Sequence, residues 1–183
     1  ESKTLAIPAE WRTRGLQRFG FHGLSHGAIA RRFPTQRLLS CDLGGGCSLA
    51  VIQNGRCIDT TMGYTPLDGL VMATRSGSLD PGVLLELLDQ GVSVEELRTG
   101  LQQRSGLLGL SDISGDMRDL RRLAANQEPG ASLAIAVFQQ HLLKAIGAGQ
   151  ALLGGVDVLV LTGGIGEHDQ ALQQWLTPRL QAI

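Results

Sequence analysis

The chain has 183 residues, of which 43% are hydrophobic and 18% are charged, and its formal net charge is −1. This length suffices for one domain with a single core. The balanced charge gives no electrostatic reason to expect nucleic acid or a membrane as a partner, and no apolar run approaches the ~18 residues of a membrane span. The three scattered cysteines form no C-x-x-C pair, so we expect core thiols in a reducing cytoplasm.

The first predicted helix begins at Ser25, which can cap it, and ends at Arg32, shortly before Pro34. Three strands follow, and we expect them at residues 37–43, 47–53 and 56–60. The last two of them are joined by Asn54-Gly55, a dipeptide typical of tight hairpin turns. Together the strands are expected to form an antiparallel meander.

A long irregular stretch follows the third strand. Residues 61–81 are rich in Gly, Thr, Ser, Pro and Met and show almost no periodicity, and such a stretch inside a domain is usually functional. Helices are expected again at residues 83–90 and from the capping box Ser93-Val94-Glu95-Glu96 towards Arg104. Gly106 is expected to end the second of these helices.

The remaining elements alternate helices, loops and one strand. We expect a loop at residues 109–115, a short helix from 116 or 117 to 124, and a long Ala-rich helix at 131–153. An apolar run at 158–162 predicts a buried strand that leads into a glycine turn. A final helix is expected near residues 170–175.

Two glycine-rich turns, each directly after a predicted strand, are the most informative feature. The first reads Asp42-Leu43-Gly44-Gly45-Gly46, and the second reads Gly163-Gly164-Ile165-Gly166. Glycine lets the backbone approach a ligand closely, and successive N–H groups in a turn can surround an anion. The second turn is neither a Walker A motif nor a dinucleotide fingerprint. We expect a nucleotide to lie between the two turns.

Two basic side chains are candidates for binding phosphate. His22 lies between an aromatic residue and a glycine just before a helix start, where its imidazole can donate to a phosphoryl oxygen. The alternative is a buried histidine bonded to the backbone. Arg75 lies in the stretch Thr74-Arg75-Ser76-Gly77 and can offer its planar fork to phosphate or carboxylate. The alternative is a loop arginine in solvent.

A third cluster, Ser114-Gly115-Asp116-Met117-Arg118-Asp119, begins a predicted helix. Asp116 and Arg118 could hydrogen-bond a ribose and stack on a base. Local capping of the helix by Asp116 explains the aspartate equally well.

Taken together, these motifs resemble the acetate kinase family, acyl-phosphate-forming enzymes of the actin, sugar kinase and heat-shock chaperone ATPase superfamily. The resemblance covers essentially the whole chain. It rests on Phe21-His22-Gly23-x-Ser25-His26, Met62-Gly63-Tyr64-Thr65-Pro66-Leu67-x-Gly69-Leu70, Thr74-Arg75-Ser76-Gly77 with Asp80-Pro81, Asp116-Met117-Arg118-Asp119 and Gly164-Ile165-Gly166-Glu167. It implies a ribonuclease H-like, actin-like ATPase α/β lobe with a mixed sheet flanked by helices. Residues 1–183 are expected to form a single domain, most of the C-terminal lobe, without the N-terminal lobe and the C-terminal tail.

The resemblance also implies roles for individual residues. His22 and Arg75 match residues that stabilise the transferring phosphoryl group, and Pro66 matches a wall of the pocket for the acyl methyl group. The implied nucleotide-binding residues are Asp42, Leu43, Gly44, Gly45, Gly46, Asp116, Met117, Arg118, Gly164, Ile165, Gly166, Glu167 and His168. Three of them depart from the family pattern: Asp42 stands where the family usually has His, and Gly45 and His168 stand where it usually has Asn.

The implied activity is reversible phosphoryl transfer from ATP to acetate, giving ADP and acetyl phosphate. Mg²⁺ is the implied metal, with its ligands expected in the absent segments and none in this chain. The resemblance implies a cytoplasmic homodimer that binds a small carboxylate and an adenine nucleotide. The chain by itself is expected to be inactive or weakly active. The alternatives are a propionate or other short-chain acyl kinase, and a non-catalytic nucleotide-binding or dimerisation module.

Overall fold

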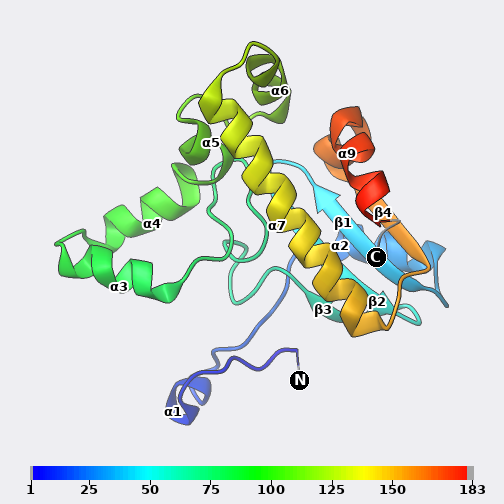
Figure 1. Cartoon of the computed structure of the whole chain (residues 1–183). Coiled ribbons are helices and arrows are strands. Elements are labelled where there is room, and N and C mark those ends of the chain that lie inside the picture. The colour runs from blue at the N-terminus through cyan, green and yellow to red at the C-terminus, as the bar shows by residue number, and fades with distance from the viewer. Residues whose placement is uncertain (1, 181–183) are drawn as a thin grey trace.

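A mixed four-stranded sheet forms the centre of the chain, in the order β3-β2-β1-β4 (Figure 1). The computed structural model describes residues 2–180, so residue 1 and residues 181–183 of the expected domain lie outside the described residues. β1 (Arg37–Leu43), β2 (Cys47–Gln53) and β3 (Arg56–Thr60) form an antiparallel meander, and β4 (Val158–Thr162) pairs parallel with β1. The predicted bounds of all these strands are confirmed.

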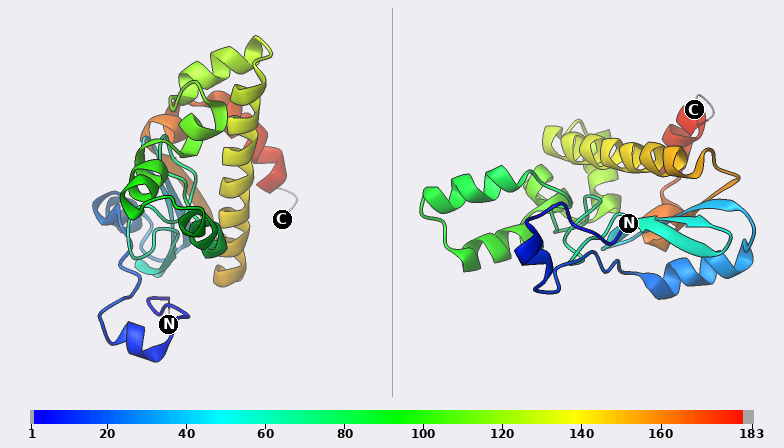
Figure 2. Two further views of the ribbon diagram at one scale, coloured as in Figure 1. Left: turned by 90° about the vertical axis from the view of Figure 1, so that its left-hand side faces the viewer. Right: turned by 90° about the horizontal axis from the view of Figure 1, so that it is seen from below.

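Both faces of the sheet are covered by helices. α7 (Pro129–Leu153) crosses one face, and α2 (Gly23–Arg32) packs on the other (Figure 2). Alternate residues of β1 therefore enter different clusters: Leu39 packs in the cluster on the α7 side, and Leu38 packs with Ala30 of α2. A strand covered on both faces is buried along its length, and β1 and β2 are accordingly buried at nearly every position and show no simple alternation.

The Asn54-Gly55 hairpin is confirmed. Asn54 has φ +51° and Gly55 has φ +72°, and positive φ at both central residues is the requirement of a type I′ turn. The turn is thus formed by the two residues that tolerate this backbone most readily.

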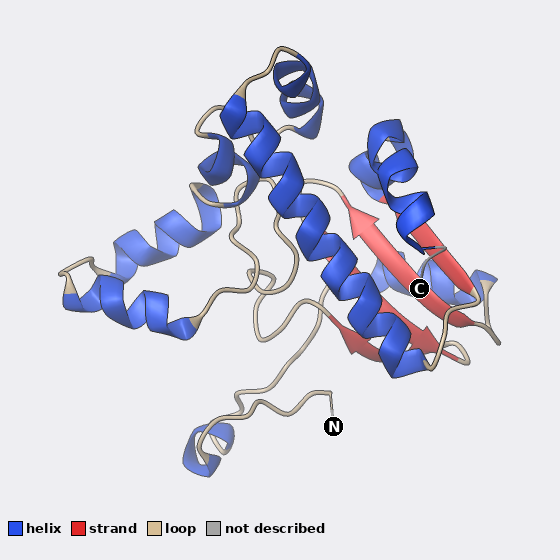
Figure 3. Ribbon diagram, viewed as in Figure 1, coloured by secondary structure: helices blue, strands red, loops and turns tan. Residues whose placement is uncertain are grey.

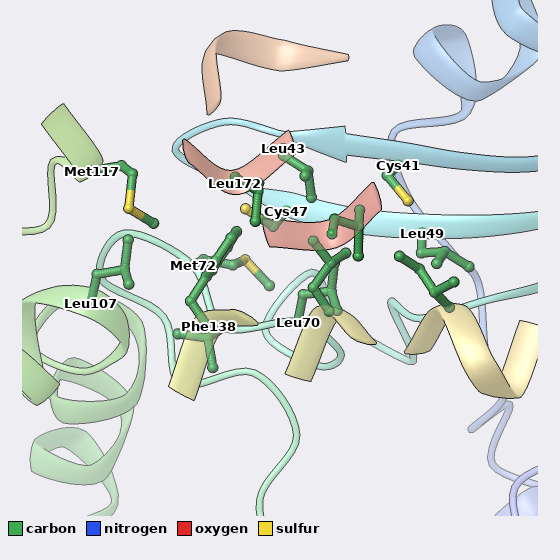
Figure 4. Close-up of a cluster of buried hydrophobic side chains, with 14 of the residues drawn as sticks. Cys41, Leu43, Cys47, Leu49, Leu70, Met72, Leu107, Met117, Phe138 and Leu172 are labelled. Carbon is green, nitrogen blue, oxygen red and sulfur yellow. The ribbon is translucent and has the colours of Figure 1, made fainter. Parts of the chain in front are cut away.

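The main core joins the sheet and α7 to segments that are far apart in the chain (Figure 4). Phe138 of α7 contacts this cluster together with Leu70 and Met72, which belong to the irregular stretch after β3. Residues 61–80 contain no helix or strand, as predicted. The stretch is nevertheless anchored, because Met62, Leu70 and Met72 are buried.

The start of α2 differs from the prediction. The helix begins at Gly23, and its N-cap residue is His22 in the left-handed conformation, with φ +58° and ψ +25°. Ser25 lies inside the first turn and does not cap the helix. The left-handed residue turns the chain into the helix, and no side-chain cap hydrogen bond is made there.

The prediction for Gly106 is wrong. α4 (Val94–Gln103) ends before it, and Gly106 begins the short helix α5 (Gly106–Ser111) with φ +64°. A Cβ atom at this position would lie 2.6 Å from the carbonyl oxygen of Arg75, so the glycine serves a close backbone approach. The expected loop at residues 109–115 is therefore helical as far as Ser111. Its N-cap residue, Ser105, makes no side-chain cap hydrogen bond, and packing of α5 on α7 stabilises the helix instead.

Four of the remaining helices agree in type with the predictions. α3 (Pro81–Asp89) is capped by Asp80, and α4 by the Ser93 hydroxyl, which accepts from the amide of Glu96 at 3.1 Å. α3 and α4 project away from the sheet (Figure 3). α6 (Met117–Ala125) and α9 (Gln170–Leu180) are present, and α9 extends beyond the predicted end. The second glycine turn is the start of a short helix, α8 (Gly163–His168), and a four-residue helix, α1 (Ala9–Arg12), was not predicted.

All three cysteines are free thiols, and two of them behave as predicted. Cys41 and Cys47 are buried, and burial raises the pKa of each thiol to about 12. Cys57 is exposed because it lies on the edge strand β3, so the expectation of a core thiol is wrong there. Within residues 2–180, no helix is both long and apolar enough to cross a membrane.

Candidate functional site

A pocket of about 700 Å³ lies where the two glycine turns meet. Its volume is within the usual range for small-molecule sites, ~300–1,000 Å³. The parallel strands β1 and β4 end side by side, at Leu43 and Thr162, and each leads directly into its glycine turn. The pocket is lined by Gly44, Gly45, Ala73, Thr74, Gly115, Asp116, Met117, Arg118, Arg121, Gly164, Ile165, His168, Asp169 and Gln170.

The two turns touch through their backbones. Gly163 has φ +77°, and a Cβ atom there would lie 2.5 Å from the carbonyl oxygen of Leu43. Within the first turn, the amide of Gly44 donates to the carbonyl of Gly46 at 3.1 Å. That amide therefore points into the turn and is not available to a ligand. The carbonyl of Gly45 accepts from the amide of Ala73 at 3.2 Å, which ties the turn to the irregular stretch.

Most of the predicted nucleotide-binding residues line this pocket, and five do not. Those that line it are Gly44, Gly45, Asp116, Met117, Arg118, Gly164, Ile165 and His168. Asp42, Leu43, Gly46, Gly166 and Glu167 are not among the lining residues. Leu43 is fully buried in the core, Gly166 packs on Leu161, and Glu167 is exposed outside the pocket.

One rim of the pocket is the first turn of α6. The Asp116 carboxylate accepts from the amide of Arg118 at 2.9 Å, and the Arg118 Nη2 lies 2.6 Å from Oδ2 of Asp116. The bonds from Arg118 lower the pKa of Asp116 to about 2. Local capping by Asp116 and a place on the pocket wall are therefore both realised, and the Arg118 side chain remains 91% exposed.

Another rim depends on an ion pair that the sequence analysis missed. Arg121 of α6 binds Asp169 through Nη2 and Oδ2 at 2.9 Å, and the Asp169 side chain is only 8% exposed. Asp169 also accepts from the amide of Leu172 at 3.1 Å, at the start of α9. The available signal was the position of Arg121, one helical turn after Met117 and so on the same face of α6. Ala73 and Gln170 were missed too, whereas Thr74 and Gly115 belong to predicted motifs but were not assigned to the nucleotide site.

Arg75 and His22 converge on the last glycine of the first turn. A Cβ atom on Gly46 would lie 2.5 Å from Nη2 of Arg75 and 3.4 Å from Nε2 of His22. Arg75 Nη1 donates to the carbonyl of Pro66 at 2.7 Å. The arginine is thus partly buried and bonded, which excludes the solvent-exposed alternative. Pro66 lies on an exposed loop beside this group.

His22 belongs to a network of side chains under the first turn. Its Nδ1 lies 2.8 Å from the hydroxyl of Ser48 and 3.7 Å from Oδ2 of Asp42. The same hydroxyl lies 2.8 Å from Nε2 of His26, whose Nδ1 lies 2.9 Å from the hydroxyl of Ser40. The His22 ring is therefore partly exposed and hydrogen-bonds a side chain. This differs from the alternative of a buried histidine that is hydrogen-bonded to the backbone. Alternation along β1 and β2 brings Ser40, Asp42 and Ser48 to one face of the sheet.

The geometry separates two regions joined by the turn at residues 44–46. Gly44 and Gly45 border the large pocket, and Gly46 borders His22 and Arg75. An elongated ligand with its bulky end in the pocket and its charged end at Gly46 fits this arrangement. The described residues contain no group of three or more His, Cys, Asp or Glu side chains that could hold a metal ion.

Comparison with known proteins decides the family. The sequence profile described as the Acetokinase family matches residues 1–183. The chain belongs to the acetokinase family.

Individual relatives agree with this assignment. The chain is 47% identical over 176 residues to the acetate kinase of Nostoc punctiforme, an alignment that covers 91% of this chain and 44% of that protein. A propionate kinase structure from Francisella tularensis is 36% identical, with a TM-score of 0.93, and covers 98% of this chain and 49% of that one. The acetate kinase structure from Porphyromonas gingivalis is also 36% identical, with a TM-score of 0.91, over 94% of this chain and 46% of that one. The chain thus has the actin-like ATPase fold of acetate kinases and spans less than half the length of these relatives.

Proposed function

We propose that this chain carries the nucleotide pocket and the phosphoryl-binding residues of an acetate kinase, which transfers phosphoryl reversibly from ATP to acetate. The observation that supports this most directly is the convergence of His22 and Arg75 on Gly46, at the end of a turn that also lines the large pocket. Phosphoryl transfer requires little covalent chemistry from the protein, so positioning and neutralisation of oxygen charge dominate.

In this proposal, the adenosine lies between α6 and α8. Met117 and Ile165 supply apolar contacts to the base, and Asp116 and Arg118 lie at the ribose end. The phosphates run along the first glycine turn towards Arg75, whose position is set by the Pro66 carbonyl. Arg75 and His22 then donate to the oxygens of the transferring group, and Pro66 lies beside the acyl group.

Mg²⁺ does not fit a site made by the described residues alone, because they contain no suitable cluster of ligands. We therefore propose that the ligands of the metal lie in segments outside this chain. The chain spans less than half the length of its relatives. Because part of the proposed cleft lies outside it, we expect the chain alone to bind nucleotide weakly and to turn over little.

Binding of ADP to the chain, measured by calorimetry, tests the pocket. Gly164 lines the pocket, and a Cβ atom there meets nothing within 4 Å among the described residues. We expect Gly164→Val to weaken ADP binding by at least about tenfold, since its side chain enters the space of the base. Gly147 of α7 also has open surroundings and does not line the pocket, so the control Gly147→Ala should bind as wild type. Equal binding by both variants would place the nucleotide elsewhere.

Acetyl phosphate formation, trapped as the hydroxamate, tests the activity in the complete protein that carries this chain. We expect Arg75→Ala to lower kcat by ~10²–10³, the usual cost of one donor to a developing negative charge. Arg98→Ala, in an exposed pair with Glu95, is the control and should leave kcat unchanged. Turnover of Arg75→Ala within a few-fold of wild type would contradict the role of Arg75. Complete lack of activity with intact ADP binding would favour a non-catalytic nucleotide-binding module.

A propionate or other short-chain acyl kinase is the second candidate, supported by the likeness to the Francisella tularensis propionate kinase. Of the residues implied for the acyl pocket, this chain offers Pro66 alone. The ratio of kcat/KM for acetate and propionate decides between the two substrates.

We further propose that the protein is a cytoplasmic homodimer. The three free thiols suit a reducing compartment. Large apolar side chains are exposed on the projecting helices α3 and α4, among them Leu85 and Val94, each 63% exposed. A second copy could cover them, and sedimentation of Leu85→Glu against wild type tests this, because a charge at the interface should shift the population to monomer.

A further inference from the structure

The hydroxyl of Ser40 has one hydrogen-bond partner among residues 2–180, namely Nδ1 of His26 at 2.9 Å. Ser40 is 0% exposed. A buried hydroxyl without an acceptor is costly, so the Ser40 O–H donates to Nδ1 of His26. Burial also lowers the pKa of His26 to about 4, which keeps the ring neutral near pH 7. A neutral ring with an accepting Nδ1 carries its single proton on Nε2.

The direction of this bond sets the direction of the next two. His26 Nε2–H has the Ser48 hydroxyl as its partner at 2.8 Å, and it therefore donates to that oxygen. Ser48 then has its own proton left, and the remaining neighbour is Nδ1 of His22 at 2.8 Å. In the neutral His22 ring, Nδ1 is thus an acceptor, and the proton lies on Nε2.

Asp42 competes with this arrangement. Its Oδ2 lies 3.7 Å from Nδ1 of His22, and a carboxylate beside Nδ1 favours a proton on that nitrogen. The Ser48 hydroxyl is nearer, at 2.8 Å. The other charged or titratable groups facing the His22 ring are Arg75, across Gly46, and His26, with ring centroids 6.4 Å apart.

We propose that Ser40, His26 and Ser48 form a hydrogen-bond relay that fixes neutral His22 as the Nε2–H tautomer. Nε2 is the nitrogen that faces Gly46 beside Nη2 of Arg75, and it has no hydrogen-bond partner among the described residues. The relay makes His22 a donor at the point where Arg75 also donates. That this donor meets a phosphoryl oxygen rests on the proposed function, whereas the position of the proton does not. Ser48, Ser40 and His26 are then positioning residues for His22.

Nitrogen-15 NMR of the histidine rings tests the relay directly. The chain has four histidines, and His22→Gln identifies the His22 signals. At about pH 8.5, two units above the usual histidine pKa of ~6.5, we expect a pyrrole-type signal with an attached proton for Nε2 of His22 and a pyridine-type signal for Nδ1. A proton on Nδ1, or on both nitrogens, at that pH overturns the proposal.

Substitution of Ser48 tests whether the relay causes the Nε2–H tautomer of His22. In Ser48→Ala, Asp42 becomes the nearest acceptor for His22, so we expect the ratio of Nδ1–H to Nε2–H to rise by about tenfold, the size that one hydrogen bond of typical strength produces. Ser48→Thr retains a hydroxyl and should restore the wild-type ratio. Ser111→Ala is the control, because Ser111 is 4% exposed and its hydroxyl bonds only to backbone atoms of residues 108–114. It removes a buried hydroxyl without contacting a histidine, and His22 should be unchanged.

Ser40→Ala extends the test to a residue that does not touch His22. Without the Ser40 donor, His26 can reverse its tautomer. We then expect the ratio of Nδ1–H to Nε2–H in His22 to shift in the same direction as in Ser48→Ala. An unchanged His22 spectrum in both serine variants overturns the relay. If Ser48→Ala does not fold, the wild-type spectrum and Ser40→Ala decide alone. No nucleotide is present in these experiments, so failure of the relay and failure of ADP binding or phosphoryl transfer are separate results.

Discussion

His26 shows how burial acts on a single residue beside the site. It is 5% exposed and contacts two serine hydroxyls. Its pKa is lowered to about 4, chiefly by burial, whereas a histidine in an unfolded chain titrates near ~6.5. Between these values the unfolded chain binds more protons than the folded chain, so protonation favours unfolding.

We therefore predict that the free energy of unfolding decreases as the pH falls from ~6.5 to ~4, with the His26 contribution fully present above ~6.5. The loss attributable to His26 should reach roughly 3 kcal/mol. Urea denaturation at a series of pH values measures it. His26→Gln cannot titrate and should show a smaller slope over this interval, while His141, whose pKa is also lowered, contributes equally to both proteins. Equal slopes would show that His26 does not cause the dependence.

At the scale of elements, hydrogen bonds and an ion pair of Asp169 stabilise the helices around the pocket. α8 is six residues long, too short to be stable by itself. Asp169 follows it, accepts from the amide of Leu172 in α9, and pairs with Arg121 of α6. The Asp169 carboxylate thus caps the start of α9 and links it to α6.

We predict that Asp169→Ala destabilises the chain by ~2–4 kcal/mol, because it removes a cap and leaves the partly buried Arg121 without its partner. Asp169→Asn retains an acceptor for the Leu172 amide and should cost less. Glu95→Ala is the matched control, since the Arg98–Glu95 pair is exposed, and it should change stability by less than ~0.5 kcal/mol. Thermal and urea unfolding provide the comparison. A cost for Asp169→Ala no larger than that for Glu95→Ala would refute the structural role.

At the scale of the whole molecule, α7 connects the sheet to the helices around the pocket (Figures 1 and 2). It packs on β1 and β2 near its C-terminal end and on α5 and α6 elsewhere. Contact with the sheet is close at Gly149, where a Cβ atom would lie 2.7 Å from Cδ2 of Leu39 and 3.1 Å from Cγ2 of Val51.

Two glycines of α7 should therefore respond oppositely to the same substitution. Gly149→Ala should destabilise the chain by ~1–3 kcal/mol through overpacking, despite the better helix propensity of alanine. Gly147→Ala, where a Cβ atom meets nothing within 4 Å among the described residues, should stabilise it by up to ~1 kcal/mol. Urea denaturation of the two variants measures the difference. A stabilising Gly149→Ala would contradict the close packing of α7 on the sheet.

Local signals explain where sequence analysis succeeded. The strand bounds, the Asn54-Gly55 hairpin and the Ser93 cap each depend on residues within a few positions of one another. Gly106 was misinterpreted because its environment is not local, and Ser25 was misinterpreted because a left-handed residue starts the helix earlier. Gly106 meets the carbonyl of Arg75, and the start of α2 follows the backbone at His22.

The sequence by itself determined the order of the strands and longer helices, the two glycine turns and the motifs that indicate the acetokinase family. Only the tertiary structure decided that these turns touch, at Gly163 and Leu43, and that Arg121 meets Asp169. It alone brought Ser40 and Ser48 to His26. The physical reason is that propensity, capping and turn chemistry act over a few residues. The hydrogen-bond relay instead joins residues 14 to 26 positions apart, and the pocket wall joins segments as distant as Leu43 and Gly163, so both depend on how these segments pack.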